Sequence, residues 1–484
     1  MRSFRLEVHR PRTQHDPGSG RSVDPERRAR RRERSPQLIV QKFGGTSLED
    51  SSALERVCGI VAKARERCPV VVVSAIGETT DRLIEALEWA ASGEESRALS
   101  GLSRLQRDTE RIVQDFFDGG SAVNAEIAPF FEELSRMARA VAVLRSVPPA
   151  GRDHFLAHGE MTSDRIVAAA LASRSLPAVA VDSREILVTD DRFGRAQPDF
   201  DETTRRVRDR LGAICARGGI PVAAGYIGSC HAGATTTLGR GGSDYTAALL
   251  AAALDAEAVE IWTDVDGMMT ADPRVVPSAR PIETISFEEA SELAYFGARV
   301  LHPLTLAPAI EKGIPIRVKN SRRPEFAGTE IRHSVESGDE HVRSIAFKKG
   351  IATVDVVTSR MLMASGFLRT LFEVFARWET PVDMVTTSEI SVSVTVDDLT
   401  HLPQIRRDLE RLAAVEVGHD RAIVCLVGQN IKFTPGIAAR VFRTIENVNV
   451  LMISQGASRR NISFVVEEKD VEEVVRLLHA EFFE

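Results

Sequence analysis

The sequence lacks a long hydrophobic run. No apolar stretch approaches the roughly 20 residues of a membrane-spanning helix, and the N-terminus does not show the charged and then apolar pattern of a secretory signal peptide. Hydrophobic residues make up 43% and charged residues 27% of the 484 residues, which is typical of a globular protein. We therefore expect about three domains with large cores, and no membrane association.

Cysteine is also scarce. The chain has only five, which are odd in number and scattered, and no two of them have the spacing of metal ligands: Cys58, Cys68, Cys215, Cys230 and Cys425. A disulfide framework needs an even number of cysteines at regular spacings. The pattern instead predicts reduced thiols in the cytoplasm.

The net charge of −7 is unevenly distributed. Residues 1–36 hold eleven Arg and five Asp or Glu, an excess of six positive charges, which leaves −13 for the remainder. An acidic body argues against a nucleic-acid-binding surface. The basic extension, residues 1–37, has almost no apolar residues to bury, so we expect it to be disordered. An arm that binds nucleic acid or another anion is the alternative for this segment.

Two glycine-rich signatures of nucleotide sites are missing. Neither Gly-x-x-x-x-Gly-Lys-Ser/Thr nor Gly-x-Gly-x-x-Gly occurs, which excludes a P-loop and leaves a dinucleotide site without support. The chain has instead Thr235–Thr263, with a Gly-Arg-Gly-Gly turn, a helix expected from Tyr245, and a β-branched strand. A glycine-rich turn that leads into a helix can bind an anion through free N–H groups and the helix dipole.

Polar side chains strengthen this anion-site hypothesis. Arg240 lies among the glycines, where its guanidinium could hold a carboxylate or phosphate through two parallel hydrogen bonds. Ser243 and Asp244 stand where N-cap residues stand. A tight turn with a good helix cap is the simpler alternative for this motif taken alone.

Two further strand-to-loop junctions carry glycine and hydroxyl residues. Leu38–Phe43 is predicted to be a buried strand that leads into Gly-Gly-Thr-Ser, and Val71–Ser74 leads into a loop with Thr80. Because ligands of α/β sheets gather at the carboxyl ends of strands, both loops point to one crevice. Lys42, beside the first loop, could neutralise a transferring phosphoryl group there. A lone lysine at this position would be read as a solvated strand end.

Helical segments fill much of the first half. Residues 81–145 are helical and rich in charge, with no recognisable chemistry. Phe155–Leu171 is predicted to be a helix that carries Glu160. Gly159 within it costs roughly 1 kcal/mol relative to alanine, which suggests a close approach by a ligand or another backbone. His158 is expected to be structural. The alternation of strands and helices predicts a mainly parallel sheet covered on both faces.

The C-terminal part repeats itself. Beyond a polar break at Gly338–Arg343, two segments match with an offset of 70 residues. Each copy reads as strand, helix, strand, strand, helix, which is a split β-α-β arrangement. The matching positions are Gly366 with Gly436, Phe372 with Phe442, and Val392, Val394 and Val396 with Ile462, Phe464 and Val466. A duplicated scaffold without a ligand is the alternative to a regulatory role.

Five motifs, in family order, resemble those of the aspartokinases of the amino-acid kinase superfamily. They are VQKFGGTS, VVSAIGETTD, HGE, LGRGGSDYTAALLAAAL with the following IWTDVDG and TADPR, and FGARVLHP. The resemblance runs from about Leu38 to the end. It implies an α/β fold, a three-layer α/β/α sandwich with a mainly parallel sheet, followed by two ferredoxin-like α+β ACT domains. The implied catalytic domain is 38–335, and the implied ACT domains are 343–420 and 421–484.

The resemblance also implies the reaction and its residues. ATP would phosphorylate the β-carboxylate of L-aspartate to give 4-phospho-L-aspartate, with Mg²⁺ bound mainly through ATP. This is the first step toward lysine, threonine and methionine. Lys42 would neutralise the transferring group, and Asp244 would orient Lys42 or the metal shell. Arg240 would bind the α-carboxylate and Glu160 the α-ammonium, with Thr80, Ser243 and Tyr226 beside the substrate. The implied ATP site comprises Lys42, Gly44, Gly45, Ser74, Thr263, Asp264, Met269, Arg274 and Arg299.

Two residues of the implied ATP site depart from the family pattern. The family often has Tyr where Met269 stands and Lys where Arg299 stands. Both substitutions leave the site plausible. They do not affect Lys42, Arg240 or Asp244.

In the C-terminal repeat the resemblance is greatest to lysine-sensitive aspartokinases. The matching positions of an effector site are Met361, Phe367, Leu368, Val382, Asp383, Thr387 and Ser388. Asp383 could receive the ammonium of an effector. Ala364 stands where lysine-sensitive relatives tend to have serine, so lysine is the first expectation and threonine its rival. ACT domains usually pair across subunits, which implies a homodimer or a dimer of dimers.

Other functions stay open on the sequence alone. A second hypothesis is a kinase for glutamate, acetylglutamate or a nucleotide, although Glu160 and Arg240 together favour a free α-amino acid. A third is a catalytically inactive amino-acid sensor, against which the intact Lys42, Arg240, Ser243 and Asp244 argue. A fused homoserine dehydrogenase is not expected, because no stretch after the repeat could hold it.

Overall fold

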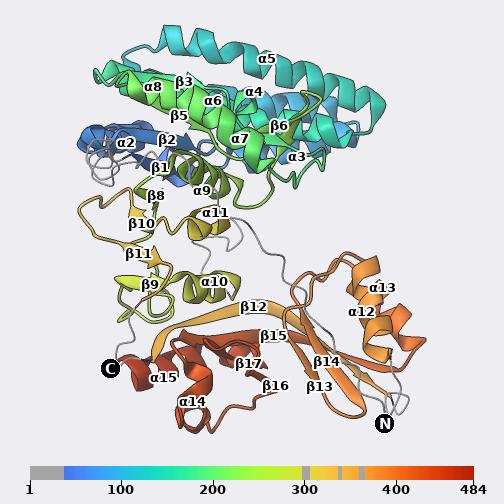
Figure 1. Cartoon of the computed structure of the whole chain (residues 1–484). Coiled ribbons are helices and arrows are strands. Elements are labelled where there is room, and N and C mark those ends of the chain that lie inside the picture. Colours follow the sequence, from blue (N-terminus) through green and yellow to red (C-terminus); the bar gives the residue numbers. More distant parts are fainter. Residues whose placement is uncertain (1–37, 297–305, 336–340, 359–365) are drawn as a thin grey trace, which may run out of the picture. The chain divides into compact units, whose positions relative to one another are not determined.

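The computed structural model describes residues 38–296, 306–335, 341–358 and 366–484 (Figure 1). Several features of the sequence therefore lie outside the described residues: the N-terminal extension, most of the Phe296–Pro303 motif with Arg299 of the implied ATP site, and Met361 and Ala364 of the implied effector region. Among the helices of the described residues, none has both the length and the apolar character to cross a membrane.

An eight-stranded sheet forms the centre of the first half of the chain. All neighbouring strands are parallel except β10 and β11, which confirms the mainly parallel sheet. In spatial order the strands are β3 (Ala178–Val181), β5 (Ile220–Ala224), β2 (Pro69–Val73), β1 (Ile39–Phe43), β8 (Ala258–Thr263), β10 (Ile316–Asn320), β11 (Thr329–Arg332) and β9 (Thr284–Ser286).

Side chains of the central strands alternate between two cores. Val40, Val70 and Val72 pack into the core on one face of the sheet, whereas Val71 and Val73 pack into the core on the other. Successive residues of a strand point to opposite faces, so a strand covered on both sides must be apolar throughout. This explains the unbroken valine run of β2.

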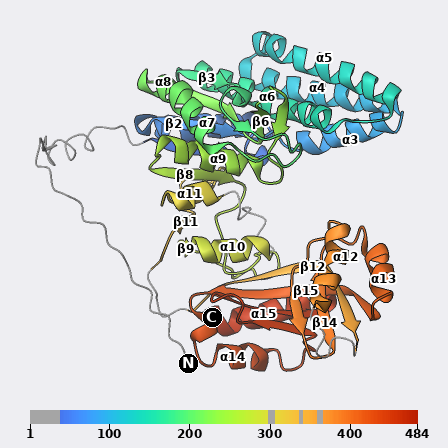
Figure 2. The ribbon, with the colours of Figure 1, turned by 45° about the vertical axis from the view of Figure 1, so that its right-hand side comes forward.

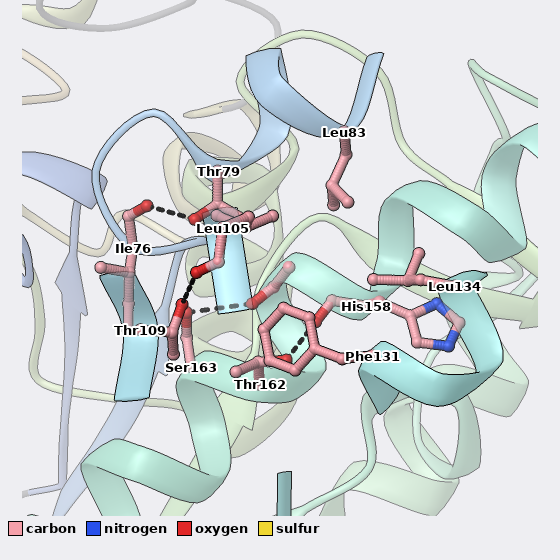
Figure 3. A pocket seen from close by; sticks show the side chains of 11 residues that line it. Ile76, Thr79, Leu83, Leu105, Thr109, Phe131, Leu134, His158, Thr162 and Ser163 are labelled. Atoms are coloured by element: carbon pink, nitrogen blue, oxygen red, sulfur yellow. Dashed lines mark hydrogen bonds between the residues drawn. The ribbon is translucent and has the colours of Figure 1, made fainter. Parts of the chain in front are cut away.

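Long helices cover one face of the sheet. Their apolar sides meet at Leu83, Leu105, Phe131 and Leu134 (Figure 3). Figures 1 and 2 show α3, α4 and α5 running side by side, which confirms the helical prediction for residues 81–145. The helices are α2 (Ser51–Lys63), α3 (Thr79–Ala91), α4 (Glu95–Phe117), α5 (Ser121–Leu144) and α6 (Pro149–Ser173).

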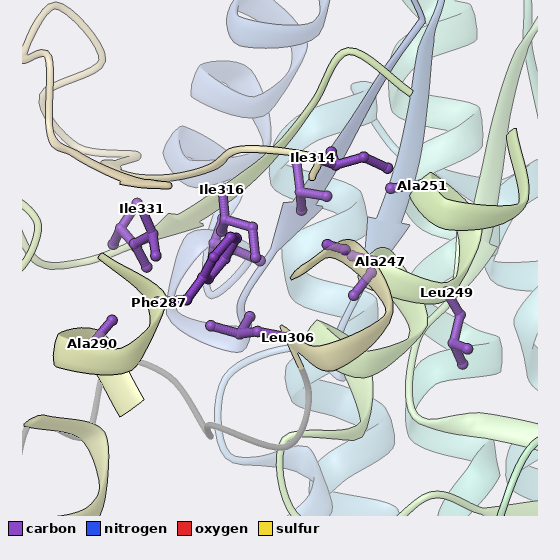
Figure 4. Close-up of a cluster of buried hydrophobic side chains, with 14 of the residues drawn as sticks. Ala247, Leu249, Ala251, Phe287, Ala290, Leu306, Ile314, Ile316 and Ile331 are labelled. Carbon is purple, nitrogen blue, oxygen red and sulfur yellow. The ribbon is translucent and has the colours of Figure 1, made fainter. Parts of the chain in front are cut away.

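Shorter helices cover the other face. Helix α9 is rich in alanine, and Ala247 and Ala251 pack in one core with Leu306 and Ile314 (Figure 4). Small side chains let this helix approach the sheet closely, and so its N-terminus is brought next to the ends of the central strands. The helices are α7 (Phe200–Val207), α8 (Ala213–Ala216), α9 (Gly242–Leu254) and α11 (Ala307–Glu311).

A small three-stranded sheet flanks helix α6. It consists of β4 (Val188–Thr189), β6 (Ile227–Cys230) and β7 (Thr235–Thr237). The buried carboxylate of Asp153, on α6, ties it down by accepting hydrogen bonds from the backbone N–H of Gly194 (2.8 Å) and Thr237 (2.7 Å). The hairpin that precedes α9 is thereby fixed to α6.

The C-terminal part forms one six-stranded antiparallel sheet with helices. Helix α10 (Phe287–Tyr295) joins it to the first half, because Phe287 and Leu293 share a core with Ile423 and Cys425. In spatial order the strands are β13 (Val385–Thr387), β14 (Ser391–Val396), β12 (Val342–Val357), β15 (Ala414–Gly428), β17 (Asn461–Glu467) and β16 (Met452–Gln455). The helices are α12 (Phe367–Arg377), α13 (Leu402–Glu410), α14 (Ile437–Thr444) and α15 (Val471–Phe483).

The predicted repeat is visible in this sheet. Gly366 and Gly436 are the N-caps of α12 and α14, both with positive φ, and the matched valine and isoleucine positions lie in β14 and β17. The two copies are not sequential blocks, however. Strand β12 pairs with β15 along its whole length, and its first part, up to Lys348, pairs with residues Ile423–Gly428. The start of the first copy therefore lies in the half of the sheet that belongs to the second.

Candidate active site

A cavity of about 620 Å³ lies where β1, β2 and β5 end and α9 begins. It is at the carboxyl ends of the parallel strands, where ligands of such sheets bind. Residues from all three predicted loops line it. Of the predicted site residues, the cavity brings together Lys42, Gly45, Ser74, Thr80, Glu160, Tyr226, Arg240, Ser243 and Asp244.

A mostly buried ion pair forms one wall of the cavity. Lys42 Nζ lies 2.8 Å from Asp244 Oδ1, and the two side chains are 12% and 10% exposed. Lys42 is on β1 and Asp244 is in the first turn of α9, so the pair joins segments about two hundred residues apart. A carboxylate at a helix N-terminus is stabilised by the helix dipole. The pair presents a fixed ammonium to the cavity.

The start of α9 differs from the sequence prediction. The helix begins at Gly242, and its N-cap is Gly241 with φ 73°, rather than Ser243 or Asp244. Both residues therefore lie inside the first turn, and neither makes a capping hydrogen bond. The cap prediction was wrong because glycine can take the left-handed conformation that this tight turn requires. Ser243 and Asp244 are left to face the cavity.

The Gly-Gly-Thr-Ser loop packs tightly on the loop after β2. Gly77 N–H donates to the Gly45 carbonyl (3.0 Å), and Gly44 N–H donates to the Trp262 carbonyl (3.1 Å) at the end of β8. A Cβ added at Gly45 would lie 2.8 Å from the carbonyl oxygens of Ala75 and Gly77. Any side chain there would push the two loops apart, so this approach requires glycine.

Tyr226 occupies a strained backbone position at the cavity. Its φ of 68° is rare for a bulky side chain, and its N–H donates to Thr246 Oγ1 (3.1 Å) on α9. The preceding Gly225 lies against the start of α9, where an added Cβ would be 2.6 Å from Ser243 Cβ. These contacts hold the tyrosine ring beside the helix N-terminus, and burial raises the pKa of its hydroxyl.

Glu160 is a buried carboxylate that faces the cavity. Only 4% of the residue is exposed, and its burial raises its pKa to about 8. It accepts a hydrogen bond from the backbone of Ala75, while its Oε2 has no partner among the described residues. A buried carboxylate with a free oxygen is costly unless a cation or donor binds it. The site thus offers a place for a positively charged group.

The glycine beside Glu160 has a packing reason. A Cβ added at Gly159 would lie 3.0 Å from Ala75 Cβ and 3.3 Å from Thr79 Cγ2. The predicted close approach is therefore present, but it is made by side chains of the loop after β2 and not by a ligand or a backbone. It sets the distance between α6 and that loop.

Arg240 supplies an opposite charge. Its side chain is exposed at the cavity, and no ion pair joins it to another residue in the part of the chain that the structure describes. Its guanidinium is therefore available to an anionic ligand. Arg240 and Glu160 thus offer a guanidinium and a carboxylate oxygen without partners among the described residues, a combination that suits a zwitterionic ligand.

Three charged residues of the cavity were missed from the sequence. Arg152 and Asp153 line it from the first turns of α6, and Asp81 lines it from the first turn of α3. Arg152, Leu156 and Glu160 are four residues apart and all line the cavity, so helical spacing back from Glu160 could have found Arg152. Asp153 could not be found this way, because its role is to accept hydrogen bonds from the backbone of Gly194 and Thr237, which are distant in the sequence.

Among the described residues of the implied ATP site, five do not line this cavity: Gly44, Thr263, Asp264, Met269 and Arg274. Thr263 ends β8 beside β1, and its hydroxyl donates to Asp264 (3.1 Å). The backbone carbonyl of Met269 accepts from the Ser344 hydroxyl (2.7 Å), and the exposed Arg274 pairs with Asp272. Both lie on the loop after β8 that packs its Ala271, Val275 and Val276 against the C-terminal sheet.

The implied effector residues flank α12, β13 and β14. The carboxylate of Asp383 accepts a hydrogen bond from the Tyr295 hydroxyl (2.9 Å) of α10, and it pairs with Lys348 (3.2 Å). Its second oxygen, Oδ2, is buried without a partner among the described residues, and burial raises its pKa. Val382 packs on the core under β14, and Phe367 and Leu368 begin α12. Thr387 ends β13, and Ser388 follows it.

Comparison with known proteins identifies two matching domain families and several similar sequences. The model of the amino acid kinase family matches residues 37–320, and an ACT domain model matches residues 424–482. The lysine-sensitive aspartokinase 3 of Escherichia coli is 38% identical over 93% of this chain and 100% of its own length. The chloroplastic aspartokinase 1 of Arabidopsis thaliana is 36% identical over 92% of this chain and 80% of its own.

Two crystal structures of E. coli aspartokinase III share the fold. One, in complex with aspartate and ADP (R-state), has a TM-score of 0.81 and 37% identity, and covers 92% of this chain and 100% of the other. The second, in complex with lysine and aspartate (T-state), has a TM-score of 0.79 and 37% identity, and covers 93% and 100%.

Proposed function

The chain belongs to the amino acid kinase family and is an aspartokinase, and from this premise we propose that it phosphorylates the β-carboxylate of L-aspartate with ATP to give 4-phospho-L-aspartate. The reaction is the first step of the pathway to lysine, threonine and methionine. The observation that carries the proposal is that one cavity combines the free carboxylate oxygen of Glu160, the unpaired guanidinium of Arg240 and the fixed ammonium of Lys42.

The amino acid binds by its two α-substituents. The free Oε2 of Glu160 accepts the α-ammonium, and Arg240 holds the α-carboxylate through two parallel hydrogen bonds. Thr80 and Ser243 donate hydroxyl hydrogen bonds, and the Tyr226 ring bounds the side chain of the substrate. This leaves the β-carboxylate to point toward Lys42.

The phosphates of ATP bind at the Gly-Gly-Thr-Ser loop and the start of α9. The amide of Gly45, the Ser74 hydroxyl and the helix dipole of α9 favour negative charge there, whereas Gly44 shapes the loop, because its N–H donates to the Trp262 carbonyl. Lys42, oriented by Asp244, neutralises the transferring phosphoryl group. For the rest of the nucleotide we retain the residues that the family pattern implies, which are Thr263, Asp264, Met269, Arg274 and Arg299.

Mg²⁺ fits this arrangement. It takes oxygen ligands and is bound with nucleotide phosphates by one or two carboxylates, and Asp244 is a carboxylate in the wall of the phosphate end. Bound with ATP, the ion supplies further neutralisation of phosphate charge. The protein's own task is to bring two anions together and hold them in line, because a carboxylate is already an adequate nucleophile and needs no general base.

Substrate analogues test the proposal. We expect turnover with L-aspartate, and little with N-acetyl-L-aspartate, which keeps both carboxylates but lacks the ammonium that Glu160 binds. L-Glutamate keeps both α-groups and is one methylene longer, so it tests the distance from Glu160 to Lys42. Faster turnover with glutamate or an acetylated amino acid would contradict the proposal, and no turnover with any of them would favour an amino-acid sensor.

The pKa of Glu160 predicts how aspartate binding depends on pH. Glu160 must be ionised to bind an ammonium, and its raised pKa of about 8 means that it is protonated in the free enzyme at lower pH. Each pH unit below about 8 should therefore raise the KM for aspartate up to tenfold, because a proton has to leave before the substrate binds. Steady-state kinetics between about pH 6 and 8 measure this. Glu160→Gln should have a high KM without this slope, and a flat wild-type profile would contradict the role.

We further propose that lysine inhibits the enzyme at the ACT region. Asp383 Oδ2 is buried and free, and Phe367, Leu368, Val382, Thr387, Ser388 and Met361 are the other residues that the family pattern implies. The Tyr295–Asp383 hydrogen bond links this carboxylate to α10 of the catalytic half, which offers a route for a lysine-dependent difference between active and inactive states.

Asp383→Ala should desensitise the enzyme. A hydrogen bond to a charged group contributes roughly 1.5–3 kcal/mol, so the lysine concentration for half inhibition should rise at least about tenfold while kcat is kept. Inhibition curves for aspartate phosphorylation measure the shift. Asp398→Ala, an exposed aspartate nearby, is the matched control and should behave as wild type. Unchanged inhibition in Asp383→Ala would move the effector site elsewhere.

The ACT region also has exposed strands that could bind another subunit. Apolar side chains of its edge strands are exposed, with Val385 on β13 at 40% and Ile453 on β16 at 45%. Exposed edge strands readily pair with another chain. We propose a homodimer, or a dimer of dimers, formed through this sheet.

A further inference from the structure

Outside the cavity, three potential metal ligands lie together between α5 and α6. His154 and His158 are four residues apart on α6 and so lie on one face of the helix, and Glu133 faces them from α5. Their ligand atoms all lie within 4.8 Å of one another. Glu133 Oε1 is 2.9 Å from His154 Nε2, and Glu133 Oε2 is 3.4 Å from His158 Nε2.

The ring of His158 has one nitrogen, Nε2, that is buried without a hydrogen-bond partner among the described residues. Its Nδ1–H donates to the backbone carbonyl of His154 (2.8 Å), which places the lone pair of the neutral ring on Nε2. The side chain is fully buried, beside Phe131 and Leu134 of α5 (Figure 3), and Nε2 has no hydrogen-bond partner among the described residues. That lone pair faces Glu133 Oε2 at 3.4 Å, so the two electron-rich atoms repel each other unless a cation lies between them.

A divalent ion suits this position, because a neutral imidazole nitrogen and a carboxylate oxygen are the forms of these groups that bind metal.

We propose that Glu133, His154 and His158 form a binding site for a divalent transition metal with the preferences of Zn²⁺. Two imidazole nitrogens and one carboxylate oxygen, with a fourth position for water, are a known tetrahedral Zn²⁺ set, whereas Mg²⁺ prefers oxygen ligands alone. Bonds of about 2.0–2.1 Å in a tetrahedron place neighbouring ligand atoms about 3.4 Å apart. The distances from Glu133, 2.9 Å from Oε1 and 3.4 Å from Oε2, are close to this value.

The surroundings meet the other requirements of such a site. Ligand histidines usually hydrogen-bond through their second ring nitrogen, and here His158 Nδ1 bonds the His154 carbonyl and His154 Nδ1 lies 3.1 Å from Thr235 Oγ1. Glu133 is 40% and His154 31% exposed, which gives the ion an entry path. The nearby guanidinium of Arg184, 3.5 Å from Thr235 Oγ1, is already neutralised by its bidentate pair with Asp182.

The site would tie α5 to α6 two residues before Glu160. A metal bound there stabilises the native state and fixes the part of α6 that faces the substrate cavity, without touching substrate or ATP. The proposal therefore does not depend on the assigned reaction, and its test needs no activity assay.

The test uses the full chain, freed of metal with a chelator and then titrated with Zn²⁺ alone, without nucleotide. We expect calorimetry to show binding to this site and thermal unfolding to shift upward with added Zn²⁺. Glu133→Gln keeps the shape of the side chain and should weaken binding at least about tenfold. Glu132→Gln, the exposed neighbour with the same change of charge, is the matched control and should bind as wild type.

A second variant and a second metal ion make the result interpretable even if Glu133→Gln does not fold. His154→Ala removes a partly exposed ligand and should also abolish the thermal shift, which covers the case that Glu133→Gln does not fold. Co²⁺ in place of Zn²⁺ should give the visible absorption of a tetrahedral ion in the wild type and not in the two variants. The proposal is overturned if the wild type does not bind Zn²⁺. It is also overturned if the wild type and both variants bind Zn²⁺ equally, which is the result that binding to free cysteines or surface histidines would give.

Discussion

Lys42→Ala is expected to lower kcat about 100- to 1,000-fold with little change in the KM for aspartate. A preorganised donor that stabilises developing charge in an enclosed site is worth roughly 2.7–4 kcal/mol in the transition state. Lys42 meets that description, because its ammonium is mostly buried and fixed 2.8 Å from Asp244. Steady-state kinetics at saturating ATP and Mg²⁺ measure the loss.

Two controls separate catalysis from structure in this experiment. Lys63→Ala removes an exposed lysine at the end of α2 and should keep full activity. The double variant Lys42→Ala/Asp244→Asn removes the carboxylate that the single variant leaves unpaired. If Lys42 served only to balance Asp244, this double variant would recover turnover. Recovery, or a kcat of Lys42→Ala close to wild type, would remove Lys42 from the mechanism.

Arg240→Ala is expected to lower kcat/KM for aspartate roughly 30- to 1,000-fold, mainly through KM. Losing one partner of a hydrogen-bonded charge pair costs about 2–4 kcal/mol, and here the α-carboxylate of the substrate would be left without its cation. The KM for ATP should stay near the wild-type value, since Arg240 is assigned to the amino acid and not to the nucleotide.

A conservative variant and a control variant test the role of Arg240 further. Arg240→Lys keeps the charge but cannot form two parallel hydrogen bonds, so it should recover only part of the loss. Arg217→Ala, at an exposed arginine after α8, should be neutral. An Arg240→Ala enzyme that changed KM for ATP and not for aspartate would place the phosphates, rather than the α-carboxylate, at this guanidinium.

Much of the fold and the family could be predicted from local sequence signals. The valine-rich run of β2 and the β-branched run of β8 are buried strands because their residues face two cores. The Gly-Gly-Thr-Ser and Gly-Arg-Gly-Gly turns indicated loops that line one cavity, which the structure confirms, and the resemblance of these motifs to the aspartokinases is confirmed. In each case a few adjacent residues carry the signal.

What could not be predicted depends on contacts between distant segments. Nothing local shows that Lys42 and Asp244 form an ion pair, that Asp153 holds the Thr237 hairpin, or that Glu160 keeps a free oxygen at a raised pKa. The start of α9 was misplaced because the conformation of Gly241, and not a capping side chain, decides where the helix begins.

The C-terminal repeat shows the same limit. The offset of 70 residues identified equivalent helices and strands, but not how the copies join. In the structure β12 and β15 are long strands that pair across both halves, with irregular register between Lys348 and Thr353 where Gly350 has a φ of 73°. The periodicity of apolar residues within a strand shows which side chains face the core. It does not show which other strands pair with it, because that depends on the whole sheet.

The most direct test of the account is the formation of aspartyl phosphate from L-aspartate, ATP and Mg²⁺, trapped as the hydroxamate, with and without lysine and with and without threonine. The account predicts a product that depends on ATP and Mg²⁺ and that lysine suppresses. Suppression by threonine alone would keep the kinase and reassign the effector. A well-folded protein that makes no hydroxamate from aspartate would contradict the assignment of the cavity as an aspartate kinase site.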